Sequence, residues 1–153
     1  MKNNNEIKKL NNKGFSLVEL IIVIAIMAVL IGVLAPQYMK YVERSNRSAD
    51  LDNWSTIISA IEIYASDPAN TATVTGNGTV KFEGKGTPGK VEVADSWVAK
   101  ALEAANIDVE KISMKSNIFG TSHVTAKATA NGVEFEIKGS NDAADSLQTA
   151  LGR

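Results

Sequence analysis

The carboxylate of Glu19 is the group in this chain whose chemistry most needs a partner. It lies in a run over residues 15–35 in which 18 of 21 residues are plainly apolar. A charge in hydrocarbon costs about 3 kcal/mol even on lenient insertion scales, so acids in such segments usually pair with another group. The chain could supply that group by being cut after Gly14. Phe15 would then carry a free, positively charged amine four residues before Glu19.

The sequence around this acid forms a specific motif. A basic leader precedes a glycine–phenylalanine pair, and a glutamate and an apolar stretch follow, in the order Lys13-Gly14-Phe15-Ser16-Leu17-Val18-Glu19-Leu20. This motif resembles the processing site of type IV prepilins and pseudopilins, and the resemblance covers residues 8–66. It implies that a membrane peptidase cleaves between Gly14 and Phe15 and methylates the new amine of Phe15. Glu19 would become the fifth residue of the mature chain.

Two other interpretations of the N-terminal region compete with this one. An ordinary secretory signal has a shorter apolar region with a small-residue cleavage site after it. Here the nearest candidate site, residues 33–35, is followed by Pro36. An uncleaved membrane anchor fits the length, because 21 helical residues span roughly 30 Å. Basic residues flank the run on both sides, so an orientation with the head outside rests on the resemblance.

Pro36 lies inside the helical pattern. Proline lacks the N–H that would donate to the carbonyl four residues earlier, here that of Gly32, so a kink is expected at this point. In assembled pilins of the resembling family this segment loses helical structure. The resemblance therefore implies an assembly role for Gly32 and Pro36, beside that of Phe15 and Glu19.

Beyond Pro36 the helical pattern becomes amphipathic. Apolar residues recur at three- and four-residue spacing, and Pro68 disfavours helix in the residue before it. We therefore expect one long helix over residues 15–66 that buries a stripe of its second half under a head. The stripe comprises Tyr38, Tyr41, Val42, Leu51, Trp54, Ile57, Ile58, Ile61, Tyr64 and Ala65. The charged residues between them, including Glu43 and Asp50, are predicted to face solvent or another subunit.

The remainder of the chain is predicted to contain an antiparallel sheet. Alternating apolar and polar residues between glycine- and asparagine-rich turns are typical of hairpins. The predicted strands are 71–75, 79–83, 90–93, 121–130 and 133–138, with hairpin turns at Gly76-Asn77-Gly78 and Asn131-Gly132 and a loop over 84–89. In the last strand Val133, Phe135 and Ile137 are expected to share one face.

Two short helices are predicted in addition to the long one. The first has about ten residues and is capped by Asp95, and the second starts at Asn141 or Asp142. Their apolar faces comprise Trp97, Val98, Ala101, Leu102 and Ala105 in the first and Ala144, Leu147 and Leu151 in the second. The result is an α+β fold like that of pilins, in which a long N-terminal helix packs its C-terminal half on an antiparallel sheet.

The chain divides into four predicted segments with different properties. They are a leader over 1–14, a hydrophobic transmembrane and assembly half-helix over 15–35, an amphipathic half-helix over 36–66, and a globular head over 67–153. Removing the leader's four lysines and one glutamate from sixteen basic and seventeen acidic residues leaves a mature charge of −4. Nucleic-acid binding by bulk charge is therefore not expected, because it needs a clustered basic surface.

The chain offers little material for catalysis or metal binding. It has no cysteine and a single histidine, His123, which alone can form neither a catalytic triad nor a histidine metal site. The stretch from Gly78 to Lys85 resembles a phosphate-binding loop but has the wrong glycine spacing and no hydroxyl residue after the lysine. Asn141, Asp142 and Asp145 lack the regular spacing of a calcium loop. No cofactor, metal site or enzymatic activity is expected.

The resemblance implies that the protein is a major pilin, the structural subunit of a type IV pilus serving adhesion, motility or DNA uptake. The expected partners are copies of itself, the prepilin peptidase, the pilus assembly platform and, before assembly, the membrane. The subunit would be a single-pass precursor in the cytoplasmic membrane and then part of a cell-surface filament. The absence of cysteine favours a Gram-positive origin. A pseudopilin or minor pilin of a secretion or competence system, and a tethered binding domain that never polymerises, are the alternatives.

Overall fold

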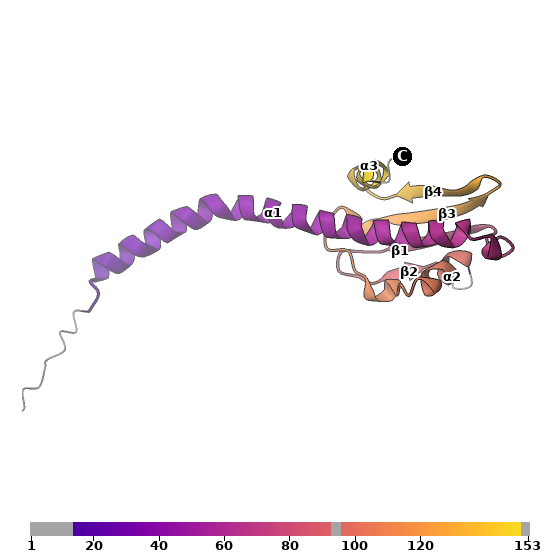
Figure 1. The fold of residues 1–153 in the computed structure, drawn as a ribbon. Helices are drawn as coiled ribbons and strands as arrows, with labels where there is room; N and C mark the ends of the chain where they lie inside the picture. Colours follow the sequence, from indigo (N-terminus) through magenta and orange to yellow (C-terminus); the bar gives the residue numbers. More distant parts are fainter. Residues whose placement is uncertain (1–13, 93–95, 151–153) are drawn as a thin grey trace, which may run out of the picture. The chain divides into compact units, whose positions relative to one another are not determined.

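The structure, a computed structural model, describes residues 14–92 and 96–150 (Figure 1). The chain divides into two compact units, one ending at Met39 and one beginning at Lys40. A single helix, α1 (Leu17–Ser66), contributes to both units. Its end at Ser66 confirms the prediction from Pro68. It begins two residues later than predicted, because Ser16 is not helical and instead binds the first turn with its side chain.

Four strands in the described residues form one antiparallel sheet. They are β1 (Asn77–Phe82), β2 (Gly89–Val91), β3 (His123–Thr129) and β4 (Gly132–Lys138), in the spatial order β2-β1-β3-β4. Together with the long helix this confirms the predicted α+β class. One face of the sheet is apolar, because Val80 and Phe82 in β1 alternate with polar residues and pair in register with equally alternating neighbours.

The core lies between this apolar face and the second half of α1. Trp54, Ile57, Ile58 and Ile61 of the helix are fully buried, as the stripe pattern predicts. The ring of Trp54 meets Phe82 of β1 edge to face with centroids 5.2 Å apart, and its indole N–H donates to the hydroxyl of Ser122 at 3.0 Å. The stripe does not extend to Tyr38, Tyr41 and Val42, which are 67%, 72% and 36% exposed. This part of the prediction is wrong, because the covered stretch of helix begins near Asp50.

The predicted first hairpin is wrong. Residues 71–75 form no strand; instead the chain leaves α1 through a 3-10 turn, η1 (Pro68–Asn70), and a further turn. Local hydrogen bonds explain the difference, since the hydroxyls of Thr71 and Thr73 donate to backbone carbonyls three residues earlier. Strand β1 therefore pairs with β2 on one side and with β3 on the other.

The second hairpin, β3–β4, is confirmed, but its turn is displaced by one residue. Thr129 pairs with Gly132, so the two turn residues are Ala130 and Asn131 rather than Asn131 and Gly132. Gly132 closes the turn with φ of 124°, a conformation that favours glycine. The predicted inward face of β4 is correct, because Val133, Phe135 and Ile137 pack against the core.

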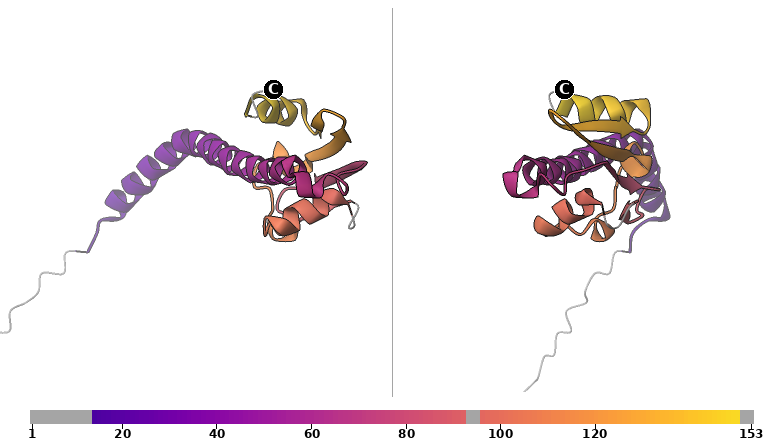
Figure 2. Two further views of the ribbon diagram at one scale, coloured as in Figure 1. Left: turned by 45° about the vertical axis from the view of Figure 1, so that its right-hand side comes forward. Right: turned by 90° about the vertical axis from the view of Figure 1, so that its right-hand side faces the viewer.

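Two helices flank the covered side of the sheet (Figure 2). Helix α2 (Trp97–Ala104) packs on β1, and α3 (Asn141–Ala150) packs on β4. The cap of α2 is Ser96, whose hydroxyl accepts from the amide of Ala99, whereas Asp95 lies outside the described residues. The predicted apolar faces need two changes, since Ala105 is exposed and Ala143 rather than Ala144 is buried with Leu147; Leu151 lies outside the described residues.

Short 3-10 turns join these elements. They are η2 (Val109–Lys111), which follows α2, and η3 (Phe119–Thr121), which precedes β3. Phe119 is fully buried, and the segment before it lies against α1. These turns bring backbone N–H groups of residues 115–117 to the helix, where two acidic side chains accept them.

Candidate processing and assembly site

The bond between Gly14 and Phe15 lies in non-helical backbone just before α1. Both residues are exposed, and the phenylalanine side chain is 89% exposed. A Cβ added at Gly14 would meet no described atom within 4 Å. Exposed, non-helical backbone is the form in which proteases cut chains. The geometry at this bond is therefore compatible with cleavage.

Glu19 already has a hydrogen-bond partner in the uncut chain. Its Oε2 accepts from the backbone N–H of Ser16 at 2.8 Å, while the hydroxyl of Ser16 accepts from the amide of Val18 at 3.4 Å. The bond from Ser16 to Glu19 is one half of a capping box, for which the spacing Ser-x-x-Glu is the sequence signature, while the hydroxyl of Ser16 caps the amide one residue before Glu19. Sequence reasoning missed it, although the signature was present. The carboxylate also lies in the first turn of α1, where the helix dipole favours negative charge.

The capping bond does not compete with cleavage. The N–H of Ser16 stays in the chain after a cut between Gly14 and Phe15, so Glu19 keeps this partner in the mature form. The second carboxylate oxygen, Oε1, accepts no hydrogen bond from any residue that the structure describes. One oxygen of Glu19 can therefore hold its own helix end while the other binds a cation.

The first half of α1 is an uncovered apolar surface. The described residues up to Val42 are all exposed; Leu20, Ile24 and Leu34, for example, are 59%, 57% and 58% exposed. By length and composition the described residues include one helix that could cross a membrane, and its most apolar window is wholly unburied. Soluble monomers rarely expose apolar patches of this size. This surface requires a lipid environment or other protein chains.

Gly32 and Pro36 lie within this exposed half. The helix is assigned without interruption through Pro36, and a Cβ added at Gly32 would meet no described atom within 4 Å. The predicted kink at this proline stays a prediction. The missing proline N–H and the flexible glycine at its acceptor position are nevertheless the two features that would let this turn unwind.

Two acids of α1 bind the backbone of the segment before η3. Asp50 is fully buried, and its carboxylate accepts from the amides of Lys115 at 2.9 Å and Ser116 at 2.7 Å. Glu43, two helical turns earlier, accepts from the amide of Asn117 at 2.9 Å. The prediction that these acids face solvent or another subunit is wrong. Their partners are backbone groups more than sixty residues away, which no pattern in the sequence marks.

The outer face of the sheet carries a network of ion pairs. Glu83, the residue after β1, contacts Lys81 of β1 at 3.3 Å and Lys90 of β2 at 3.4 Å. In β3 and β4, Glu136 contacts both Lys127 and Lys138 at 2.7 Å. The hydrogen bond from Lys127, with that from Lys138, lowers the pKa of Glu136 to about 2. This face is charged but internally neutralised.

His123 and the acidic residues of α3 are the metal-ligand candidates that the sequence offers. His123 lies on the outer face of β3, in register between Lys81 of β1 and Lys138 of β4. The part of the chain that the structure describes contains no group of three or more potential metal-binding side chains. The side chains of Asn141 and Asp142 lie outside that part.

Comparison with known proteins agrees with this geometry. Residues 9–35 match the family described as the prokaryotic N-terminal methylation motif. The chain is also 31% identical over 117 residues to a protein of Clostridium perfringens named prepilin peptidase-dependent protein A, a match that covers 69% of this chain and 84% of that protein. The chain belongs to the type IV pilin family.

Other relatives match this pilin over a shorter stretch. A type IV major fimbrial protein FimA of Dichelobacter nodosus is 40% identical over 55 residues, and a second is 42% identical over 50. These matches span about a third of each chain, 36% and 33% of this pilin and 35% and 32% of the relatives. No solved structure matches the chain.

Proposed function

We propose that this pilin is the major subunit of a type IV pilus. The observation that carries the proposal is a processing motif placed directly before an apolar half-helix whose surface is entirely uncovered in the single chain. Polymerisation through that half-helix would bury the surface, and relatives named as major fimbrial proteins match about a third of the chain. We expect adhesion, motility or DNA uptake as the task of the filament.

Processing would begin at the exposed bond between Gly14 and Phe15. A prepilin peptidase would cut this bond in the membrane-bound precursor and methylate the amine of Phe15. Methylation keeps the positive charge of that amine. The relative from Clostridium perfringens is named for its dependence on such a peptidase. After cutting, the subunit would leave the cytoplasmic membrane through an assembly platform and join a surface filament.

Glu19 would then set the position of each incoming subunit. The methylated amine of Phe15 is a cation within an apolar surface, and an unpaired charge in that setting costs several kcal/mol. A subunit in the wrong axial register leaves the amine and a neighbouring carboxylate unpaired. Pairing within one chain competes with this arrangement, because the amine and Glu19 are also four residues apart on one helix.

Mass spectrometry of the mature N-terminus tests the processing step. We expect a chain that begins at methylated Phe15, and we expect Gly14→Glu to leave the leader attached. A normally shortened Gly14→Glu product would contradict the assignment of the leader.

Filament yield tests the assembly step. We expect Glu19→Ala to be cleaved and inserted in the membrane but to assemble poorly, since the amine then lacks its acid. Wild-type amounts of Glu19→Ala filaments would contradict the register argument.

A minor pilin or pseudopilin is the second candidate. The relative that matches most of the chain is named only for its processing and not as a fimbrial subunit. A minor subunit would be rare in sheared filaments, whereas a major pilin would be their principal component. Quantitative proteomics of purified filaments decides between the two.

A further inference from the structure

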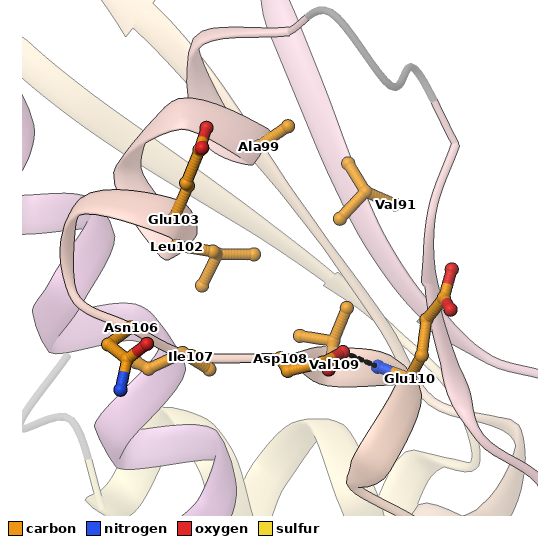
Figure 3. A pocket seen from close by; sticks show the side chains of 9 residues that line it. All are labelled: Val91, Ala99, Leu102, Glu103, Asn106, Ile107, Asp108, Val109 and Glu110. Carbon is orange, nitrogen blue, oxygen red and sulfur yellow. Dashed lines mark hydrogen bonds between the residues drawn. The ribbon is translucent and has the colours of Figure 1, made fainter.

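The head carries an open apolar pocket with acidic rims. It lies between α2 and η2, has a volume of about 340 Å³, and its apolar lining includes Val91, Leu102 and Val109 (Figure 3). Glu103 of α2 and Glu110 of η2 stand on opposite sides of it. This volume is near the lower limit of the ~300–1,000 Å³ typical of ligand pockets, so the pocket suits one large side chain rather than a cofactor.

The two rim acids are free to bind a cation. Neither Glu103 nor Glu110 forms an ion pair with any residue in the described ranges, and both are exposed. The third acid at the rim, Asp108, differs from them because Lys111 contacts it at 2.8 Å. The hydrogen bond from Lys111 lowers the pKa of the Asp108 carboxyl. The pocket therefore offers an apolar floor and two unpaired negative charges.

Helix α1 carries a surface of the opposite character. Tyr41 is 72% exposed, and Lys40 and Arg44 beside it make no ion pair with a described residue. Lys40 and Arg44 are four residues apart, so both project from the same side of the helix. We name Lys40, Tyr41 and Arg44 the basic helix segment. It combines one large aromatic side chain with two unpaired positive charges.

We propose that the basic helix segment of a second copy of this chain docks in the acid-rimmed pocket, with Tyr41 over the apolar floor and Lys40 and Arg44 at Glu103 and Glu110. The inference rests on the proposed function as a filament subunit and names the head surface that receives a neighbouring helix. The two surfaces complement each other in charge and polarity. Such complementarity fixes register and suppresses other arrangements of two partners.

Cross-linking in intact filaments tests the contact directly. The chain has no cysteine, so the pair Tyr41→Cys with Glu103→Cys introduces the only two thiols. With a short bismaleimide we expect a ladder of covalent oligomers. The matched control pairs Tyr41→Cys with Glu134→Cys, an exposed acid of β4 on the outer face of the sheet, and should stay monomeric. Filaments that form without a ladder would overturn the docking inference while leaving the pilin function intact.

Charge exchange provides a second test that does not depend on cysteine variants assembling. We expect Glu103→Lys with Glu110→Lys to lower filament yield at least about tenfold, because like charges then face each other. Adding Lys40→Glu and Arg44→Glu should restore the yield, and Glu134→Lys alone should leave it unchanged. If adding Lys40→Glu and Arg44→Glu does not restore the yield, the docking inference is overturned. A wild-type chain that is neither cleaved nor polymerised overturns the proposed function and the docking together.

Discussion

At the scale of single residues, Asp50 illustrates how a buried acid can be satisfied by backbone alone. Its carboxylate accepts from two amides, those of Lys115 and Ser116, and no basic side chain is needed. Hydrogen bonds to a charged acceptor are stronger than neutral ones and offset part of the desolvation cost of the carboxylate. Asp50 thereby fixes the segment before η3 on the helix.

We expect Asp50→Ala to lower the free energy of unfolding by about 2–4 kcal/mol, because two amides lose their acceptor and a cavity is left. Tryptophan fluorescence during denaturation of the full chain in detergent measures this, since Trp54 and Trp97 are both buried. Asp52→Ala is the control, because Asp52 is exposed and should change stability by less than about 0.5 kcal/mol. Equal losses in the two variants would contradict the role of Asp50.

Glu136 predicts a pH dependence of the β3–β4 hairpin. Its pKa in the folded chain is about 2, below the ordinary value of 4.5, because Lys127 and Lys138 bind its charged form. The stabilisation is therefore complete above pH 4.5 and is lost as the pH falls towards 2. The side chain is 39% exposed, so solvent screening keeps the effect small.

The measurement is the thermal midpoint of wild type and Glu136→Gln as a function of pH. We expect the wild type to melt higher at pH 6 and the two midpoints to converge near pH 2. High salt should also reduce the difference, since it screens exposed ion pairs. If the two thermal midpoints still differed at pH 2, the effect of Glu136→Gln would not come from the loss of the charged carboxylate.

At the scale of elements, the sequence correctly predicts the helices and strands that are determined by residues close together in the chain. The long helix ends where Pro68 requires it, and the alternation in β3 and β4 gives the correct inward face. The strand predicted over 71–75 fails because threonine hydroxyls bind nearby carbonyls and stabilise turns. Strand composition alone cannot reveal that competition.

The candidate site shows the same division. Gly14, Phe15 and Glu19 follow from a contiguous motif, whereas the contacts of Glu43 and Asp50 join positions more than sixty residues apart. Their charges suggested a solvated face, because a single sequence gives no sign of a backbone segment that returns to cover them. Partners that are main-chain amides carry no residue-type signal at all.

Gly78 lies where α2 approaches β1 closely. A Cβ at this position would lie 2.4 Å from Cγ2 of Val98, so Gly78→Ala should destabilise the head by about 1–3 kcal/mol. Gly84→Ala is the control, because its nearest neighbour, Thr87, is 3.4 Å away. Combining Gly78→Ala with Val98→Ala should cost less than the sum of the two, which a double-mutant cycle by chemical denaturation measures. Additive losses would argue against a direct clash.

At the scale of the whole molecule, the proposed filament makes Pro36 a mechanical element. Pro36→Ala restores the N–H that can donate to Gly32, and proline disfavours a helix interior by about 3 kcal/mol relative to alanine. Filaments of this variant should therefore extend less under a given pulling force. Single-filament force measurements test this, with Gln37→Ala as the control. Unchanged extension would show that this turn does not unwind.

The burial of Trp54 has a consequence for the order in which the protein can fold during synthesis. The apolar stripe of α1 leaves the ribosome early, but its covering groups, Ser122 in the turn before β3 and Leu147 in α3, are made some seventy to ninety residues later. Translation delivers the N-terminal part first. The core of the head therefore cannot be completed before α3 has been made, and until then part of the stripe lies uncovered.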